Sequence, residues 1–208
     1  MTGSDGSPAR AAGTRGPYAK SEGVRRAILD AALEVFAQSG YRGGALRAVA
    51  DRVGMSEAGL LHHFPSKGAL LVAVLEHRDA ESQRFVPPDD EDGPESLRWL
   101  VRLAGYNAST PGVVELYCML SAEATSPDHP AHAYFVGRYE SARSRLTATF
   151  ERLAAAGALN PGVDAGSAAR TTIALMDGLQ IQWLLDRDSV DMAEELRGHL
   201  NRLIVADL

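Results

Sequence analysis

Apolar residues recur along most of this chain at intervals of three and four, the spacing that places them on one side of a helix. The first stripe begins after Ser21, a plausible N-cap, and runs to about Gln38. Further helices are predicted over residues 66–83, 95–108, 110–126, 130–156, 165–185 and 190–205. Because no stretch shows the alternation of a strand, we expect an all-α fold of about nine helices, two short ones between Ala45 and Phe64 included.

The two short helices are separated by a tight turn. Gly54 stands where the first must end in a left-handed conformation, which glycine adopts without a Cβ clash. Ser56 is a good N-cap for the second helix, and Pro65 ends it because the residue before a proline avoids the helical region. This order is typical of a helix-turn-helix unit, whose second helix fits the major groove of DNA. A helical hairpin with no nucleic-acid role has the same spacing.

The identities of the residues favour DNA binding. Residues 56–67, SEAGLLHHFPSK, with the following GALLVAVLEH, resemble the recognition helix and the next helix of TetR-family (tetracycline-repressor-like) regulators. The upstream AALEVFAQSGYRGGALRAVADRVGMS resembles that family's first two helices. The resemblance covers about residues 21–76 and is architectural beyond them. This chain departs from the family at Gly44, where threonine is frequent, and at Leu61 and His62, where tyrosine is frequent.

The resemblance implies a homodimeric regulator, most often a repressor, that binds a palindromic double-stranded DNA operator and is released by a small molecule. A dimer would place two reading helices in successive major grooves. The free amides at the first turn of the helix after Pro65 also favour a phosphate contact at Lys67. The residues expected to contact DNA are Arg47, Ser56, Glu57, Ala58, Gly59, Leu61, His62, His63 and Lys67.

Charge is divided unevenly along the chain. Residues 1–84 hold 11 Lys and Arg against 9 Asp and Glu, whereas the whole chain has a net charge of −6. A basic N-terminal part on an acidic body suits a DNA reader with a separate second domain. Residues 86–96, VPPDDEDGPES, mark the boundary between them. We therefore expect a disordered basic tail (1–20), a DNA-binding domain (21–84) and a ligand-binding and dimerisation domain (95–208).

The second domain carries aromatic and polar residues that suit a small-molecule cavity between helices. Single aromatic residues at helical spacing are more often part of the core. Asp177, on a mostly apolar helix, requires a partner, either a ligand donor or cation, or an arginine such as Arg138 or Arg170. The expected ligand-binding residues are Trp99, Leu103, Tyr106, Tyr117, Tyr134, Arg138, Met176, Asp177 and Gln180.

The last two predicted helices are expected to form the subunit interface, as the resemblance implies. Gly178 lies in mid-helix, where glycine costs about 1 kcal/mol relative to alanine, and this indicates a close approach of another helix. The alternative is that the same face packs within one chain. The expected interface residues are Gly178, Ile181, Leu185, Leu196, Leu200 and Leu203.

Other functions are less well supported by the sequence. The adjacent His62 and His63 point to different faces of a helix, and no ExxH or Cys/His cluster completes a metal site, so we expect no enzyme, metal or cofactor. Cys118, the single cysteine, lies in an apolar run and suits a buried inert thiol in a cytoplasmic protein without a membrane helix. A constitutive DNA-binding protein without a small-molecule ligand remains the alternative, which a filled second domain would favour.

Overall fold

The computed structural model describes residues 17–82, 85 and 94–208, which contain nine helices and one isolated β-bridge, between Leu159 and Ile204. The helices are α1 (Pro17–Gly43), α2 (Leu46–Val53), α3 (Glu57–His63), α4 (Lys67–Ser82), α5 (Glu95–Ala108), α6 (Pro111–Glu123), α7 (His132–Ala155), α8 (Ala165–Leu185) and α9 (Met192–Asn201). The all-α fold expected from the sequence is confirmed.

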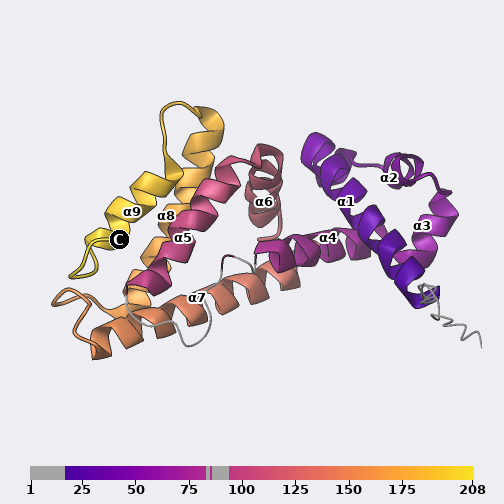
Figure 1. The fold of residues 1–208 in the computed structure, drawn as a ribbon. Helices are drawn as coiled ribbons and strands as arrows, with labels where there is room; N and C mark the ends of the chain where they lie inside the picture. The colour runs from indigo at the N-terminus through magenta and orange to yellow at the C-terminus, as the bar shows by residue number, and fades with distance from the viewer. Residues whose placement is uncertain (1–16, 83–84, 86–93) are drawn as a thin grey trace, which may run out of the picture.

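Helix α4 links the two ends of the molecule (Figure 1). The helices α1, α2 and α3 gather at one end, and α5, α8 and α9 form a bundle at the other. The long helix α7 packs along α8, while α6 packs against both α1 and α8. A movement of α4 relative to the body would therefore move the helix-turn-helix unit.

The N-terminal core is built around α4. Its residues Leu70, Leu71, Val74 and Leu75 are completely buried, as the apolar stripe predicted. The same core includes apolar residues of α6 and the start of α7, namely Leu116, Leu120, Ala124, Ala131 and Phe135. Tight packing thus continues from the expected DNA-binding domain into the body. The expected boundary falls largely in residues 86–93, outside the described residues.

Helix α1 is longer than the sequence predicted. It begins at Pro17, whose fixed φ and missing amide hydrogen suit the first helical turn, so the expected cap at Ser21 is wrong. Its end is also later, because the helical pattern resumes after a kink at Gly40, where φ is 65° and ψ is 172°. Residues 17–20 are helical rather than part of a tail, and residues 1–16 lie outside the described residues.

The C-terminal helix is shorter than predicted. Asp191 caps the start of α9 by accepting hydrogen bonds from the amides of Ala193 and Glu194, so the helix does not begin at Val190. At the other end, the side-chain amide of Asn160 donates to the carbonyls of Arg202 and Ile204, each at 3.1 Å. These two carbonyls accept from the Asn160 side chain instead of from amides further along a helix. The chain after α9 therefore forms a turn and does not continue the helix.

Candidate functional site

The two short helices form the helix-turn-helix geometry that the sequence predicted. Gly54 is left-handed, with φ at 70°, and ends α2. The Ser56 hydroxyl accepts a hydrogen bond from the amide of Gly59 at 3.1 Å and so caps α3. Leu60 and Phe64 anchor α3 in the core below, with exposed fractions of 0% and 2%. The cap and the two anchors fix the orientation of the reading helix.

Most residues expected to contact DNA lie on the outer surface of this unit. Ser56, Glu57, Ala58, Leu61 and His62 are exposed along α3, while Gly59 and His63 are partly buried. Arg47 is exposed on α2, and its nearest anionic partner is Asp51, at 3.9 Å one turn away. The geometry is compatible with the predicted contacts, which stay predictions.

Lys67 has intramolecular partners as well. At the start of α4, its ammonium donates to the carbonyl of Arg42 at 3.1 Å and lies 4.8 Å from the ring centroid of Tyr41. Ser66 caps this helix by accepting from the amide of Ala69. An ammonium has three donors, so Lys67 can hold the end of α1 and still donate to a phosphate.

Gly44 packs directly against the core of this unit. It is buried, and a Cβ at this position would lie 2.6 Å from Cδ1 of Phe36. The absence of the family's frequent threonine therefore has a packing reason here. Helix α2 begins at Leu46, and its N-cap residue, Ala45, has no side chain that could cap it.

A cavity of about 890 Å³ lies in the body, between α4, α5, α6, α7 and α8. Of the nine expected ligand-binding residues, eight line it: Trp99, Leu103, Tyr117, Tyr134, Arg138, Met176, Asp177 and Gln180. Tyr106 does not line it, and this prediction is wrong. The ring of Tyr106 stacks on Phe85 with the centroids 4.8 Å apart, and the guanidinium of Arg78 lies 4.7 Å from its centroid.

Several residues that line the cavity were not predicted from the sequence. Asp79 and Ser82 come from α4, which the sequence assigned only to the first domain, and Cys118, Ser121 and Tyr139 come from α6 and α7. Helical periodicity identifies a buried stripe but does not say which distant helix it faces. No local pattern therefore indicated that α4 reaches the cavity.

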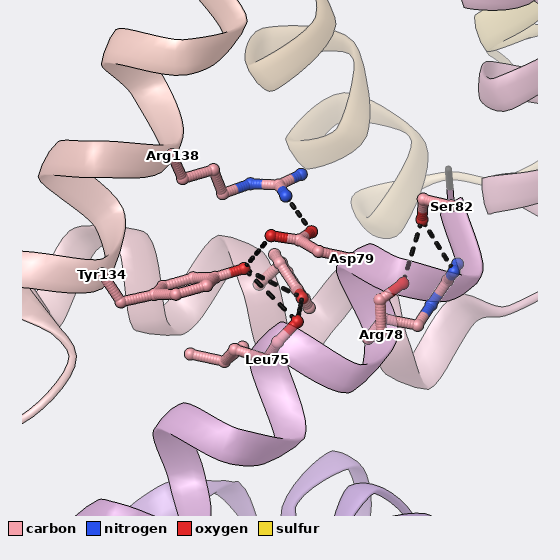
Figure 2. A network of polar contacts seen from close by, with 7 residues as sticks. Leu75, Arg78, Asp79, Ser82, Tyr134 and Arg138 are labelled. Carbon is pink, nitrogen blue, oxygen red and sulfur yellow. Dashed lines mark hydrogen bonds and ion pairs between the residues drawn. The ribbon is translucent and has the colours of Figure 1, made fainter. Parts of the chain in front are cut away.

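A polar cluster ties α4 to α7 at the cavity wall (Figure 2). Asp79 is ion-paired with Arg138 and accepts a hydrogen bond of 2.6 Å from the Tyr134 hydroxyl. The Tyr117 hydroxyl donates to the carbonyl of Leu75, also on α4, at 3.0 Å. Burial raises the pKa of Tyr117 to about 12 and also raises that of Tyr134, so both phenols stay protonated and able to donate.

Asp177 lies on the α8 side of the same cavity. Its Oδ2 atom accepts a hydrogen bond of 2.9 Å from the Tyr139 hydroxyl. Of the two alternatives that the sequence left open, the one with an arginine partner is not formed among the described residues, since Arg138 is paired with Asp79. Burial raises the pKa of Asp177, whereas the Tyr139 hydrogen bond and the charge of Arg138 lower it. Nearby, the Cys118 thiol donates to Oε1 of Gln180 at 3.7 Å, and burial raises its pKa to about 11. This thiol is therefore protonated at pH 7 rather than a thiolate.

The residues expected at a subunit interface divide into two groups. Leu196 and Leu200 are completely buried in the body core together with residues of α5, so they present no surface to a partner. Ile181 and Leu185 lie on α8 with exposed fractions of 52% and 83%. Gly178, on the same side of α8, has open space where a Cβ would be. Leu203 is partly buried. The surface that could contact a second subunit therefore consists of the exposed side of α8 and Leu203.

Two further features bear on alternative functions. Among the described residues, no three His, Cys, Asp or Glu side chains gather as metal ligands would. No single described helix has the length and apolarity to cross a membrane; only α3 and α4 taken together do, and they are bent by 61°.

The N-terminal and C-terminal parts both match known families. Residues 28–74 match the family model of bacterial regulatory proteins of the tetR family, and residues 116–206 match that of the BetI-type transcriptional repressor C-terminal region. The HTH-type transcriptional regulator RutR of Escherichia coli (strain K12) is 49% identical over 51 residues, 24% of this chain and 24% of RutR. The matched part thus spans about a quarter of the length of this relative.

Solved structures resemble nearly the whole chain. A protein from Saccharomonospora viridis in complex with choline superposes with a TM-score of 0.75 at 26% identity, over 89% of this chain and 99% of that one. The SmeT–triclosan complex superposes with a TM-score of 0.72 at 20% identity, over 86% and 89% of the two chains, and shows the fold alone. The two family matches, over residues 28–74 and 116–206, show that the chain belongs to the TetR family of bacterial transcriptional regulators, which are DNA-binding proteins rather than enzymes.

Proposed function

We propose that this protein is a ligand-responsive repressor that binds a palindromic operator as a homodimer and is released by a small apolar or amphipathic molecule. The observation that carries the proposal is the course of α4. Its first residue, Lys67, lies beside the reading helix, and Asp79, three turns later, lies in the cavity wall. One rigid element therefore joins a DNA-reading surface to a space for a ligand.

The reading unit supports the DNA part of the proposal. Helix α3 is capped by Ser56, anchored by Leu60 and Phe64, and exposed on its outer side. In this arrangement Arg47, His63 and Lys67 hold the DNA backbone. Glu57 accepts from a cytosine amine, while Leu61 touches a thymine methyl group.

The exposed face of α8 supports the dimer. Ile181 and Leu185 expose apolar side chains, and Gly178 allows another helix to come close. A two-fold contact through this face supplies the second reading helix that a palindromic operator requires.

The cavity supports a ligand and disfavours the constitutive alternative, which a filled body would have favoured. Its volume of about 890 Å³ suits a drug-sized molecule. A ligand releases the operator only to the extent that it prefers the released state. A hundredfold preference corresponds to about 2.7 kcal/mol.

The test is an electrophoretic mobility shift with the DNA upstream of the protein's own gene, at two salt concentrations. Binding should weaken steeply with salt, because each phosphate contact releases counterions. The variant Lys67→Ala should weaken binding to all DNA sequences about equally and reduce the slope of log affinity against log salt by about 1.

Arg102→Ala is the matched control, because it removes an exposed positive charge from α5, outside both the helix-turn-helix unit and the proposed dimer face on α8. It should leave both the affinity and the slope unchanged. Absence of a shift at low salt would contradict DNA binding altogether, and a sequence-selective loss in Lys67→Ala would contradict the phosphate role.

A further inference from the structure

The cavity wall contains two well-placed carboxylates with different surroundings. Asp79 has a complete set of strong partners, namely the guanidinium of Arg138 and the hydroxyl of Tyr134. Asp177 has the hydroxyl of Tyr139 at 2.9 Å on its Oδ2 atom. Within the described residues, no hydrogen bond or ion pair reaches the other oxygen, Oδ1.

This difference leaves the α8 side of the cavity with unused capacity to accept hydrogen bonds. An ionised carboxylate has about four acceptor sites, and Tyr139 fills one at Asp177. A partly buried carboxylate without an ion pair is costly. The pKa of Asp177 is raised by burial even though the charge of Arg138 offsets part of that effect, which agrees with this cost. A bound cation would remove it.

None of the described arginines that line the cavity forms an ion pair with Asp177. Arg138 is bound directly to Asp79. Arg78, with an exposed fraction of 3%, turns away from Asp79 and donates to the Ser82 hydroxyl at 2.9 Å (Figure 2). Arg145 lies two helical turns beyond Arg138 on α7 and is exposed.

Besides Arg138, whose charge is already paired with Asp79, the cavity offers Asp177 mainly uncharged neighbours. Trp99, Leu103 and Met176 supply apolar and aromatic surface in the same cavity. The thiol of Cys118 and the amide of Gln180 are polar but neutral, and they contact each other. An aromatic wall next to a carboxylate attracts organic cations, because the face of the ring and the carboxylate are both negative.

We propose that the effector is a protonated amine on an apolar body, with its ammonium group bound to Oδ1 of Asp177 and its body packed against Trp99, Leu103 and Met176. This inference rests on the proposed ligand-binding function of the cavity and narrows it to one chemical class. An anionic group in the same position would face the Asp177 charge, and a neutral group would leave it without a cation.

The test uses three probes that share one apolar body: phenylbutylamine, phenylbutanol and phenylbutyrate. Their binding to the full-length protein at pH 7 is measured by isothermal titration calorimetry and by tryptophan fluorescence, because Trp99, one of the two tryptophans, lines the cavity. The amine should bind at least about tenfold more tightly than the alcohol or the acid, because a charge-assisted hydrogen bond is roughly twice as strong as a neutral one.

Two matched variants locate the preference. Asp177→Asn keeps the size of the side chain and an acceptor for Tyr139, so it should abolish the preference for the amine and leave alcohol binding unchanged. Glu140→Gln removes a carboxylate from the exposed α7 side of the cavity and should preserve the preference.

Each other outcome overturns the proposal in a recognisable way. Equal binding of all three probes, or tightest binding of the acid, would refute the cationic class while leaving ligand binding intact. A preference that survives in Asp177→Asn would place the cation elsewhere. No binding of the amine at millimolar concentration would also refute the proposal, and DNA binding, measured without any probe, would be judged separately.

Discussion

Asp79 of α4 and Arg138 of α7 form an ion pair across the cavity wall, although 59 residues separate them in the chain. The pair, with the Tyr134 hydroxyl, joins the helix that carries the reading unit to the helix that closes the cavity. A ligand that moves α7 therefore acts on α4 through a polar contact as well as through apolar packing. The ion pair between Asp79 and Arg138 is therefore a specific contact through which the proposed ligand site could be coupled to the proposed DNA-binding site.

Removal of this charge should destabilise the protein. In Asp79→Asn, Arg138 and Tyr134 lose an ionised partner, and we expect the free energy of unfolding to fall by about 1–2 kcal/mol in a urea titration. The control is Asp30→Asn, which breaks the exposed contact between Asp30 and His77 and should cost less. Equal losses in the two variants would show that the cluster has no special role.

Loss of the α3 cap should affect stability and DNA binding together. Ser56→Ala leaves the Gly59 amide without its acceptor and should cost about 1 kcal/mol of unfolding free energy. Because α3 frays, operator affinity measured by fluorescence anisotropy should fall as well. Asp164→Ala removes the equivalent cap of α8, which binds the Ser167 amide at 2.8 Å. This control should lose similar stability but retain operator affinity; a parallel loss of affinity would contradict the reading role of α3.

The exposed face of α8 provides a test of the dimer. Leu185 has an exposed fraction of 83%, so a charged side chain at this position should not destabilise the fold of a single chain. Leu185→Arg should therefore yield a folded monomer in sedimentation equilibrium and abolish tight operator binding. Val136→Arg changes a residue of α7 that is 53% exposed and should remain dimeric. A wild-type chain that is monomeric at micromolar concentration would refute the dimer directly.

The raised pKa of Asp177 predicts a pH-dependent stability. Burial disfavours the ionised form in the folded state, so this carboxyl costs stability above its folded pKa and costs nothing below its unfolded value. Asp177→Asn should therefore raise Tm at pH 7 in the absence of ligand, and the gain should disappear as the pH falls below the unfolded pKa. An unchanged Tm at pH 7 would mean that the carboxylate is well solvated.

The local structure of the reading unit could be predicted from the order of its residues. Gly54, Ser56 and Pro65 act through backbone conformation and capping within a few residues, so their effect is visible in the linear pattern. The buried stripe of α4 was equally predictable, because helical periodicity alone places its four residues on one face. Asp177 and Gln180, both expected at the ligand site, line the cavity.

Which helices meet could not be predicted in this way and depends on how the whole chain packs. Tertiary packing joined Asp79 to Arg138, gave Asp177 the hydroxyl of Tyr139 in place of an arginine, and turned Tyr106 away from the cavity. It also buried Leu196 against the neighbouring helices of the same chain. The physical reason is that periodicity fixes the face of a helix, whereas the partner of that face depends on how distant helices pack around a shared core.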